Sequence, residues 1–316
     1  MIPKISILIP VYNVELYIKK CCTSLFSNTI AKDCEFIFVN DCSTDNSIQK
    51  LQQTISEFPE LKNNIKIINH DNNKGLATAR NTAISNACGK YIICVDSDDW
   101  VEKDYLEKLY NHANQNKSDI VLCNVYREES NNTISITTTN NNKDLITSTL
   151  EGDIFGWLFY KLIRTSLFFD NGITWIDGIN MEEDLIITCK IFFFAKKITF
   201  MQDFLYHYNC LNTDSLSHNL TQNKIDQLNN SIIEIENFLQ KNNQLEKYKQ
   251  SVLCRKGLNK LWILKDSIEI KCEYLELYNS EKLFKCKKLS LHTRFFFFLC
   301  YLKLYRLCKF LLKFIR

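Results

Sequence analysis

The chain is predicted to adopt an α/β fold, in which a mostly parallel sheet is flanked by helices and followed by a mainly helical C-terminal region. Apolar strand-like runs alternate with helical patterns over the first 125 residues, and residues 220–316 have mostly helical patterns. Such alternation favours a parallel sheet with helices on both faces. The predicted strands are Ile5–Ile9, Cys34–Val39, Ile65–Ile68, Tyr91–Val95 and Ile120–Val125, and the predicted helices between them are Glu15–Phe26, Ser47–Phe58, Leu76–Asn86 and Lys103–Asn114. A polar hairpin or loop is expected at residues 131–143.

The composition indicates a globular protein that works in a reducing compartment. Of the 316 residues, 46% are apolar and 24% are charged, which is enough for a sizeable core. A net charge of +3 is too small to indicate a nucleic-acid partner, and none is expected. The 14 cysteines include no C-x-x-C pair, so structural zinc and thioredoxin-like chemistry are not expected. Unpatterned thiols and an N-terminus without signal-peptide architecture predict a cytoplasmic location.

The fourth predicted strand runs directly into three carboxylates, Asp96, Asp98 and Asp99. An unbroken apolar run of this kind is typical of a strand buried on both faces of a parallel sheet. Ligands of open α/β sheets bind beyond the carboxyl ends of the strands, where these acids stand. Carboxylates this close repel one another unless a cation or a shared proton intervenes. The segment therefore predicts a divalent metal that holds a phosphate, with a solvated turn that caps the next helix as the alternative.

Polar residues also follow the first three strands. The first strand ends in Pro10-Val11-Tyr12-Asn13 and lacks the G-x-G-x-x-G cradle, so a bound pyrophosphate would need another positive charge, which a metal supplies. Tyr12 could stack on a base or face the core. Asp41, at the end of the second strand, could accept the N–H of a pyrimidine. Lys74 and Arg80 could reach an anionic ligand, with a helix-surface salt bridge as the alternative for Arg80.

Taken together, these segments resemble the family 2 glycosyltransferases of the GT-A fold. The resemblance is dense over residues 3–125 and implies a nucleotide-sugar donor (a UDP-sugar), a divalent cation (Mn²⁺ or Mg²⁺) and transfer with inversion to a hydroxyl acceptor. It is carried by I-P-V-Y-N, V-N-D-C-S-T-D-N-S, N-K-G-L-A-T-A-R-N and G-K-Y-I-I-C-V-D-S-D-D-W, in that order, and then by Trp157, Glu182-Glu183-Asp184 and Leu205-Tyr206-His207-Tyr208.

The resemblance also implies a role for each matching residue. In one place the chain departs from the family, because Cys42 stands where Gly is usual, which predicts a tighter or differently angled turn. The implied roles are the nucleoside pocket for Pro10, Tyr12 and Asp41, the donor site for Lys74 and Arg80, the D-x-D motif for Asp96-Ser97-Asp98, and the catalytic base for Asp184, with Glu183 as the alternative base.

Strand geometry divides the work within the D-x-D motif. Residues i and i+2 of a strand lie about 6.5 Å apart, whereas adjacent oxygen ligands of one Mg²⁺ are only about 3 Å apart. Asp98 is therefore assigned as the direct metal ligand, and Asp96 is assigned to the ribose or to a metal-bound water. His207 is a further candidate metal ligand, with a structural role as the alternative. Asp99 is expected to cap the following helix.

The chain is predicted to form a glycosyltransferase domain at residues 1–215 and a helical region at 216–316. Within the first, residues 1–125 would bind the nucleotide-sugar, and residues 150–215 would supply the acceptor site and the base. Residues 282–316 contain ten Lys or Arg and no Asp or Glu. Their basic positions recur every three or four residues among aromatic and aliphatic ones, which is typical of a helix on an anionic membrane surface. The alternative is a helix docked on the protein's own core. Charges interrupt each apolar stretch before the ~18 residues that a membrane span needs.

The expected function is hexosyl or N-acetylhexosaminyl transfer to a glycan or lipid-linked acceptor. The expected setting is bacterial polysaccharide synthesis, such as lipopolysaccharide or capsule, with the protein peripheral at the inner face of the cytoplasmic membrane. Two alternatives remain: an inactive membrane-associated module that binds nucleotide-sugars, and a phosphohydrolase with an aspartyl nucleophile. The phosphohydrolase would normally carry its motif on the opening strand, whereas Asp96 follows the fourth strand.

Overall fold

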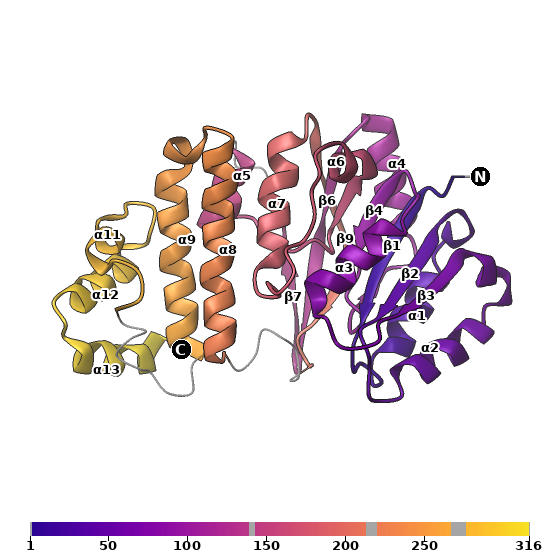
Figure 1. Cartoon of the computed structure of the whole chain (residues 1–316), viewed down its shortest axis with the longest axis horizontal. Coiled ribbons are helices and arrows are strands. Elements are labelled where there is room, and N and C mark those ends of the chain that lie inside the picture. Colours follow the sequence, from indigo (N-terminus) through magenta and orange to yellow (C-terminus); the bar gives the residue numbers. More distant parts are fainter. Residues whose placement is uncertain (1, 139–142, 213–219, 267–275, 316) are drawn as a thin grey trace. The chain divides into compact units, whose positions relative to one another are not determined.

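The computed structural model describes residues 2–138, 143–212, 220–266 and 276–315, and it divides the chain into two compact units (Figure 1). The first unit contains residues 1–141 and 157–213, and the second contains residues 142–156 and 214–316. The segment 142–156 thus groups with the C-terminal helices, although all of it was expected in the first domain, residues 1–215. The expected boundary after residue 215 falls in a segment outside the described residues.

The described part of the first unit contains one nine-stranded sheet, whose order is β3-β2-β1-β4-β8-β6-β9-β5, with β7 paired to β6. Strands β1 to β4 pair in parallel with one another, which confirms the α/β fold class. All residues of β1 and β4 are buried, as expected for strands covered on both faces. The strands that were predicted are β1 (Ile5–Val11), β2 (Glu35–Asn40), β3 (Ile65–Asn69), β4 (Tyr91–Cys94) and β6 (Ile120–Glu129).

Helices cover both faces of this sheet. The chain moves from β1 outward to β3, so the right-handed crossovers place α1 and α2 on one face, where they contact each other. It then returns past β1 to β4, which places α3 on the opposite face, against β1 and β2. The helices of this unit are α1 (Ile18–Phe26), α2 (Ser47–Ser56), α3 (Leu76–Ser85), α4 (Tyr105–Asn116), α6 (Thr165–Asp170) and α7 (Glu183–Phe194), with short 3-10 turns at Ala31–Asp33 and Pro59–Asn64.

Strands β5, β8 and β9 were not predicted, and they give the sheet its mixed character. β8 (Lys161–Arg164) is antiparallel to both β4 and β6, and β5 (Trp100–Val101) is antiparallel to β9 (Ile198–Asn209). The polar segment after β6 does form a hairpin, with β7 (Asn132–Ile136) returning along β6. Residues 139–142 of the expected hairpin lie outside the described residues. The long strand β9 runs beside β6 and brings its C-terminal end to β5, directly after the D-x-D motif.

The second unit is helical, as predicted. In it α5 and α8 pack against α9, and α11 packs against α12. No helix in the described part of the chain is long and apolar enough to cross a membrane. The last part of the basic segment forms two helices, α12 and α13, between which the chain turns at Lys303, whose φ is 57°. The helices are α5 (Leu145–Glu151), α8 (Gln222–Lys241), α9 (Leu245–Asp266), α11 (Ser280–Lys285), α12 (Leu291–Tyr301) and α13 (Tyr305–Ile315).

Candidate active site

The candidate site lies where β1, β2, β3 and β4 end at the same edge of the sheet. The backbone N–H of Asp41 donates to Val11 at 2.9 Å, and the N–H of Val95 donates to Leu8 at 3.0 Å, so the segments after these strands begin side by side. Pro10 is buried within β1 opposite Val39. Tyr12 emerges at the end of β1 with 47% of its surface exposed. Its aromatic face is thus available at the edge of the sheet.

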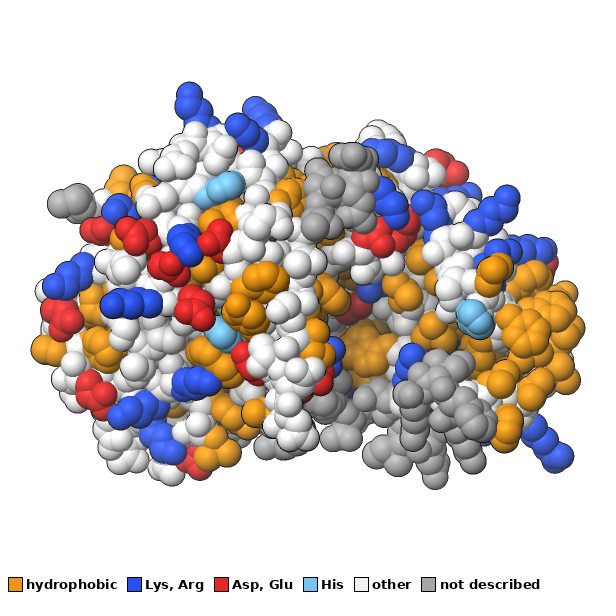
Figure 2. All heavy atoms as spheres, turned by 180° about the vertical axis from the view of Figure 1, so that it is seen from behind, with side chains coloured by type: hydrophobic (Ala, Val, Ile, Leu, Met, Phe, Trp, Pro, Cys, Tyr) orange, Lys and Arg blue, Asp and Glu red, His pale blue; other side chains and the backbone are white. Residues whose placement is uncertain are grey.

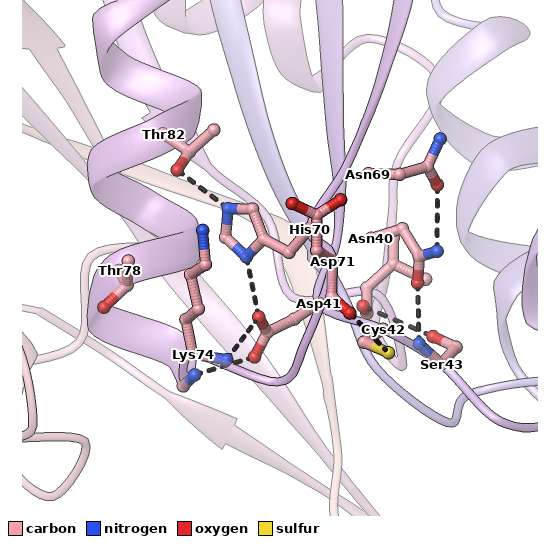
Figure 3. A network of polar contacts seen from close by, with 12 residues as sticks. Asn40, Asp41, Cys42, Ser43, Asn69, His70, Asp71, Lys74, Thr78 and Thr82 are labelled. Carbon is pink, nitrogen blue, oxygen red and sulfur yellow. Dashed lines mark hydrogen bonds and ion pairs between the residues drawn. The ribbon is translucent and has the colours of Figure 1, made fainter.

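The Asp41 carboxylate is buried and held by three donors (Figure 3). Its Oδ1 accepts the backbone N–H of Lys74 at 2.8 Å and lies 2.7 Å from Nδ1 of His70. Its Oδ2 accepts the backbone N–H of Gly75, also at 2.8 Å. Asp41 therefore anchors the loop that enters α3, and Oδ2, with one donor, retains acceptor capacity. The structure brings Lys74 to Asp41 through its backbone, and the Lys74 side chain is exposed.

His70 was missed by the sequence analysis. It follows β3 directly, as Asp41 follows β2, and its backbone N–H donates to Asn40 at 2.9 Å. Its Nε2 lies 2.9 Å from the hydroxyl of Thr82 on α3. The sequence could have indicated His70 only through its position directly after a predicted strand, at the same edge of the sheet as Asp41. The residues around His70 in the sequence form no motif.

Arg80 links the carboxylates that follow β4 to those at the start of α7. Its side chain is 2% exposed, and its Nη2 donates to Asp96 at 2.9 Å while Nη1 donates to Glu183 at 2.6 Å and also to Asp184. Burial opposes its charge, but the attraction of Asp184, Asp96 and Glu183 is stronger, so the pKa of Arg80 is raised well above its ordinary value. The alternative of a helix-surface salt bridge for Arg80 is thus wrong, because this ion-pair network is buried.

Glu183 and Asp184 begin α7, and both are nearly enclosed. Burial, reinforced by the neighbouring Asp184, raises the pKa of Glu183 to about 8. Burial also raises the pKa of Asp184, but there Arg80 is the main opposing influence, and the backbone N–H of Leu158 donates to Asp184 Oδ2 at 3.1 Å. The two acids therefore differ in character, because Asp184 has more direct support for its ionised form and Glu183 favours the protonated form.

The carboxylates after β4 have different partners. Asp98 accepts one side-chain hydrogen bond, from Asn212 at 2.7 Å, and burial beside Asp96 raises its pKa to about 6. Asp99 is fully buried and accepts the Tyr206 hydroxyl at 2.6 Å and the Asn209 backbone N–H at 2.7 Å.

The expected helix-capping role of Asp99 is wrong, because its carboxylate fastens the D-x-D segment to β9. The residue after it, Trp100, begins a strand, and the N-cap of α4 is Asp104.

His207 lies among aromatic rings and carboxylates. Its ring stacks on Trp100 with 5.1 Å between centroids, and its Nδ1 and Nε2 lie 2.7 Å from Glu128 and 2.9 Å from Glu102. Both ring nitrogens are thus engaged by carboxylates, which favours the structural role over that of a metal ligand. No group of three or more His, Cys, Asp or Glu suited to a metal occurs in the described part of the chain.

Cys42 adopts the left-handed conformation, with φ of 63°. Glycine reaches this region without strain, whereas an L-residue with a side chain is strained there. The position where the family usually has Gly is thus occupied by a residue less suited to this backbone conformation.

The fold and the carboxylate site together define an enzyme of the GT-A class. The model of the Glycosyl transferase family 2 matches residues 6–174, so the chain belongs to family 2 of the glycosyltransferases. A relative, the putative glycosyltransferase EpsH of Bacillus subtilis (strain 168), is 33% identical over 277 residues, which cover 84% of this chain and 76% of EpsH. This assignment excludes the phosphohydrolase alternative.

Further comparisons agree on the family and the fold. The poly(ribitol-phosphate) beta-glucosyltransferase of Bacillus spizizenii is 36% identical over 209 residues, which cover 65% of this chain and 32% of that protein. The crystal structure of S. aureus TarS 1–349 in complex with UDP-GlcNAc matches with a TM-score of 0.64 at 20% identity, covering 97% of this chain and 90% of that one. At this identity, the likeness to TarS shows that the two share a fold.

Proposed function

We propose that this glycosyltransferase moves a sugar from a UDP-sugar to a hydroxyl of a glycan or lipid-linked acceptor, with inversion, in bacterial polysaccharide synthesis. The relative from B. spizizenii is named for transfer to poly(ribitol phosphate), and TarS was crystallised with UDP-GlcNAc. Lipopolysaccharide and capsule are the polymers that we expect. The observation that carries the proposal is the buried Arg80, which holds Asp96 of the donor motif and the Asp184 carboxylate on one guanidinium.

Asp184 is the proposed catalytic base. It would accept the proton of the attacking acceptor hydroxyl, and its contacts with Arg80 and the Leu158 N–H favour its ionised form against the burial that raises its pKa. Glu183 is less suited, since a pKa of about 8 leaves it mostly protonated at neutral pH. A hexosyl or N-acetylhexosaminyl group would be the transferred unit.

The donor would lie along the edge of the sheet that carries Asp41 and Asp96. Pro10 and Tyr12 would flank the nucleoside, and Asp41 Oδ2 would accept the N–H of the base. Asp96, partly exposed beyond β4, would bind the ribose hydroxyls or a metal-bound water. Lys74, whose ammonium has no hydrogen-bond partner among the described residues, would approach the anionic part of the donor.

The residues present fit a hard divalent cation, Mn²⁺ or Mg²⁺, with Asp98 as its direct ligand. Burial, reinforced by the neighbouring Asp96, raises the pKa of Asp98 to about 6, and Asp98 has no ion-pair partner among the described residues, which supports a ligand that brings positive charge. Carboxylate oxygens are the ligands that such cations prefer. When bound, the cation would stabilise the charge that develops on the leaving nucleoside diphosphate.

Replacement of the base tests the proposal. Asp184→Asn should reduce sugar transfer by about 100-fold or more, the size of a general-base contribution, while the affinity for UDP stays within a few-fold of the parent. Radiolabelled transfer and calorimetric UDP binding measure the two effects. Near-normal turnover would remove Asp184 as the base. A parent that binds UDP but transfers no sugar to any glycan or lipid-linked acceptor would favour the inactive module.

We further propose that α12 and α13 rest on an anionic membrane surface at the inner face of the cytoplasmic membrane. Half of the large apolar side chains that are exposed in the described part of the chain lie between residues 291 and 310. Figure 2 shows hydrophobic side chains gathered on this part of the second unit, with Lys and Arg nearby. The exposed apolar residues are Leu291, Phe295, Phe298, Tyr301, Leu302, Leu304, Leu307 and Phe310. Basic residues lie between them in the sequence, at Arg294, Lys303, Arg306 and Lys309.

The alternative, a helix docked on the protein's own core, explains the buried apolar side of α12 but not its exposed apolar side. Phe296, Phe297 and Leu299 are buried within the second unit, whereas Phe295 and Phe298 on the same helix are exposed. A surface helix that is apolar on both sides indicates a partner. The surrounding positive charge favours anionic lipid as that partner. Arg316 and the side chains of residues 313–315 lie outside the described residues.

Vesicle binding tests the membrane proposal. Phe295→Ser with Phe298→Ser should abolish sedimentation with phosphatidylglycerol vesicles, while Ile233→Ser, an equally exposed apolar site on α8, should leave it unchanged. The parent should not sediment with phosphatidylcholine vesicles. Equal binding of the parent to both lipids, or unchanged binding of the double variant, would contradict the proposal.

A further inference from the structure

His70 forms a buried link between Asp41 and Thr82 that the proposed catalytic roles leave unexplained. The exposed fraction of the side chain is 6% for His70 and 5% for Asp41. The imidazole lies 2.7 Å from Asp41 Oδ1 through Nδ1, and 2.9 Å from Thr82 Oγ1 through Nε2 (Figure 3). Three separate elements, the ends of β2 and β3 and the helix α3, are thus joined through one ring.

The contacts determine the proton positions on the imidazole. An ionised Asp41 only accepts hydrogen bonds, so Nδ1 of His70 must carry a proton and donate it. In the neutral ring Nε2 then accepts, and the Thr82 hydroxyl is the donor that it faces. Thr82 therefore selects the tautomer that His70 needs in order to hold Asp41.

The same contacts determine the direction in which Asp41 can accept a further hydrogen bond. Oδ1 receives both His70 and the Lys74 N–H, whereas Oδ2 receives only the Gly75 N–H. A carboxylate oxygen can accept about two hydrogen bonds, so Oδ2 keeps one acceptor position. His70 thus fills the oxygen that the ligand does not use and fixes the rotation of the carboxylate.

We propose that His70 is a positioning residue for the nucleobase of the donor, acting through Asp41, with Thr82 setting its tautomer. This inference rests on the proposed nucleotide-sugar function. An acceptor oxygen fixed in this way suits a base that presents an imide N–H, as uracil and thymine do. Cytosine presents an unprotonated ring nitrogen at that position, so the carboxylate would repel it. His70 thereby contributes to the choice of base, although it does not touch the base.

The experiment compares ligands with and without the base. Binding of UDP, CDP and inorganic pyrophosphate, each with Mn²⁺, is measured by calorimetry for the parent, His70→Leu, His70→Asn and Thr82→Val. Thr78→Val is the matched control on the same helix, since the Thr78 hydroxyl donates to the exposed Asp177. Unfolding temperatures are measured alongside, so that variants that fail to fold are recognised.

We expect His70→Leu to weaken UDP binding about tenfold or more, the effect of one lost hydrogen bond to a buried charge. Pyrophosphate binding should change less than about twofold, because it has no base. His70→Asn keeps a side-chain N–H near the position of Nδ1 and should restore most of the UDP affinity. Thr82→Val should show a smaller loss than His70→Leu, and Thr78→Val should show none.

Three outcomes separate failure of this inference from failure of the proposed function. If the folded parent binds UDP over CDP but His70→Leu does so equally well, the role of His70 is wrong and the function stands. If His70→Leu weakens UDP and pyrophosphate alike, its role is general and structural, which also overturns the inference. If the parent binds no nucleotide, the proposed function itself fails. Should His70→Leu not fold, the folded Thr82→Val decides, because unchanged UDP affinity there overturns the inference.

Discussion

Two carboxylates at the same edge of the sheet, Asp41 after β2 and Asp98 after β4, are held in opposite ways. Asp41 receives two backbone N–H groups and an imidazole. Asp98 receives one side-chain amide, and burial beside Asp96 raises its pKa to about 6. The first carboxylate is held by donors of the protein itself, whereas the second has no ion-pair partner among the described residues.

The difference shows which half of the site is complete without its ligand. A carboxylate with fixed donors is pre-organised to select a ligand by shape and hydrogen bonding. A cluster of carboxylates that raise one another's pKa values is suited to a ligand that brings positive charge. Arg80 is the internal compensation of the second half, and it reaches Asp96 but also Glu183 and Asp184.

Among the changes to these two halves of the site, removal of Arg80 is expected to cost the most unfolding free energy. Arg80→Met leaves three carboxylates near a buried site without their guanidinium, and the loss of one partner from a buried ion pair costs about 3–5 kcal/mol. Urea denaturation measures the loss of unfolding free energy. Lys108→Met, which removes an exposed pair with Asp104 and Asp203, is the control and should cost at most about 1 kcal/mol. Equal stability of the two variants would mean that Arg80 does not hold the acids together.

Glu183 should make stability depend on pH. Its pKa rises from the ordinary 4.5 to about 8 on folding. Between pH 4.5 and about 8, the folded protein therefore keeps a proton on Glu183 that the unfolded chain has released. This contribution to stability is complete below pH 4.5 and is lost as the pH rises to about 8. Glu183→Gln has no titrating carboxyl at this position, so the stability of this variant relative to the parent should increase across the window, by several kcal/mol. A constant difference between the two in urea denaturation would contradict the assignment.

Loss of the Tyr206 hydroxyl should weaken the attachment of the D-x-D segment to β9. Tyr206→Phe removes the donor to Asp99 and the acceptor of the Asp96 N–H, two hydrogen bonds that are worth about 1 kcal/mol each. Tyr105→Phe is the matched change, because its buried hydroxyl donates to the neutral carbonyl of Phe159 and should cost only about 1 kcal/mol. The account predicts the larger cost for Tyr206, measured by thermal and urea unfolding, and the reverse order would be evidence against it.

The smallest expected effect is a gain in stability from Cys42→Gly. The φ of 63° strains a residue with a side chain, and the relief is partly offset by the greater freedom of glycine in the unfolded chain. The net gain should be at most about 1 kcal/mol. Cys42→Ala keeps the strain and should show no such gain, so equal effects of the two changes would point to loss of the thiol instead.

Local patterns predicted the parallel half of the fold. The first four strands appear within two residues of their predicted limits, and the helices between them likewise within three, because apolar runs and helical periodicity are local signals. The short β8 and the two-residue β5 have no such pattern and exist through their partners β4, β6 and β9. Tertiary pairing therefore decided the mixed half of the sheet.

The site residues were named from their positions after the strands and from the resemblance, but their partners were not visible in the sequence. Arg80 meets Asp184 across 104 positions, and Asp99 meets Tyr206 across 107. Such contacts depend on how the sheet and helices pack, which no single-sequence pattern records. His70 was missed for the same reason, since its importance comes from Asp41 and Thr82 and not from its neighbours along the chain.

The proposed cation site at the acids after β4 is tested most directly by calorimetry. Binding of UDP to the parent and to Asp98→Asn is measured with Mn²⁺ and with a chelator. The account predicts that the parent binds UDP with Mn²⁺ and loses most of that affinity in the chelator. Asp98→Asn should bind weakly in both conditions, because it lacks the carboxylate that the cation needs. Strong binding of UDP by the parent in the chelator, or metal-dependent binding by Asp98→Asn equal to that of the parent, would contradict the claim that the acids after β4 await a cation.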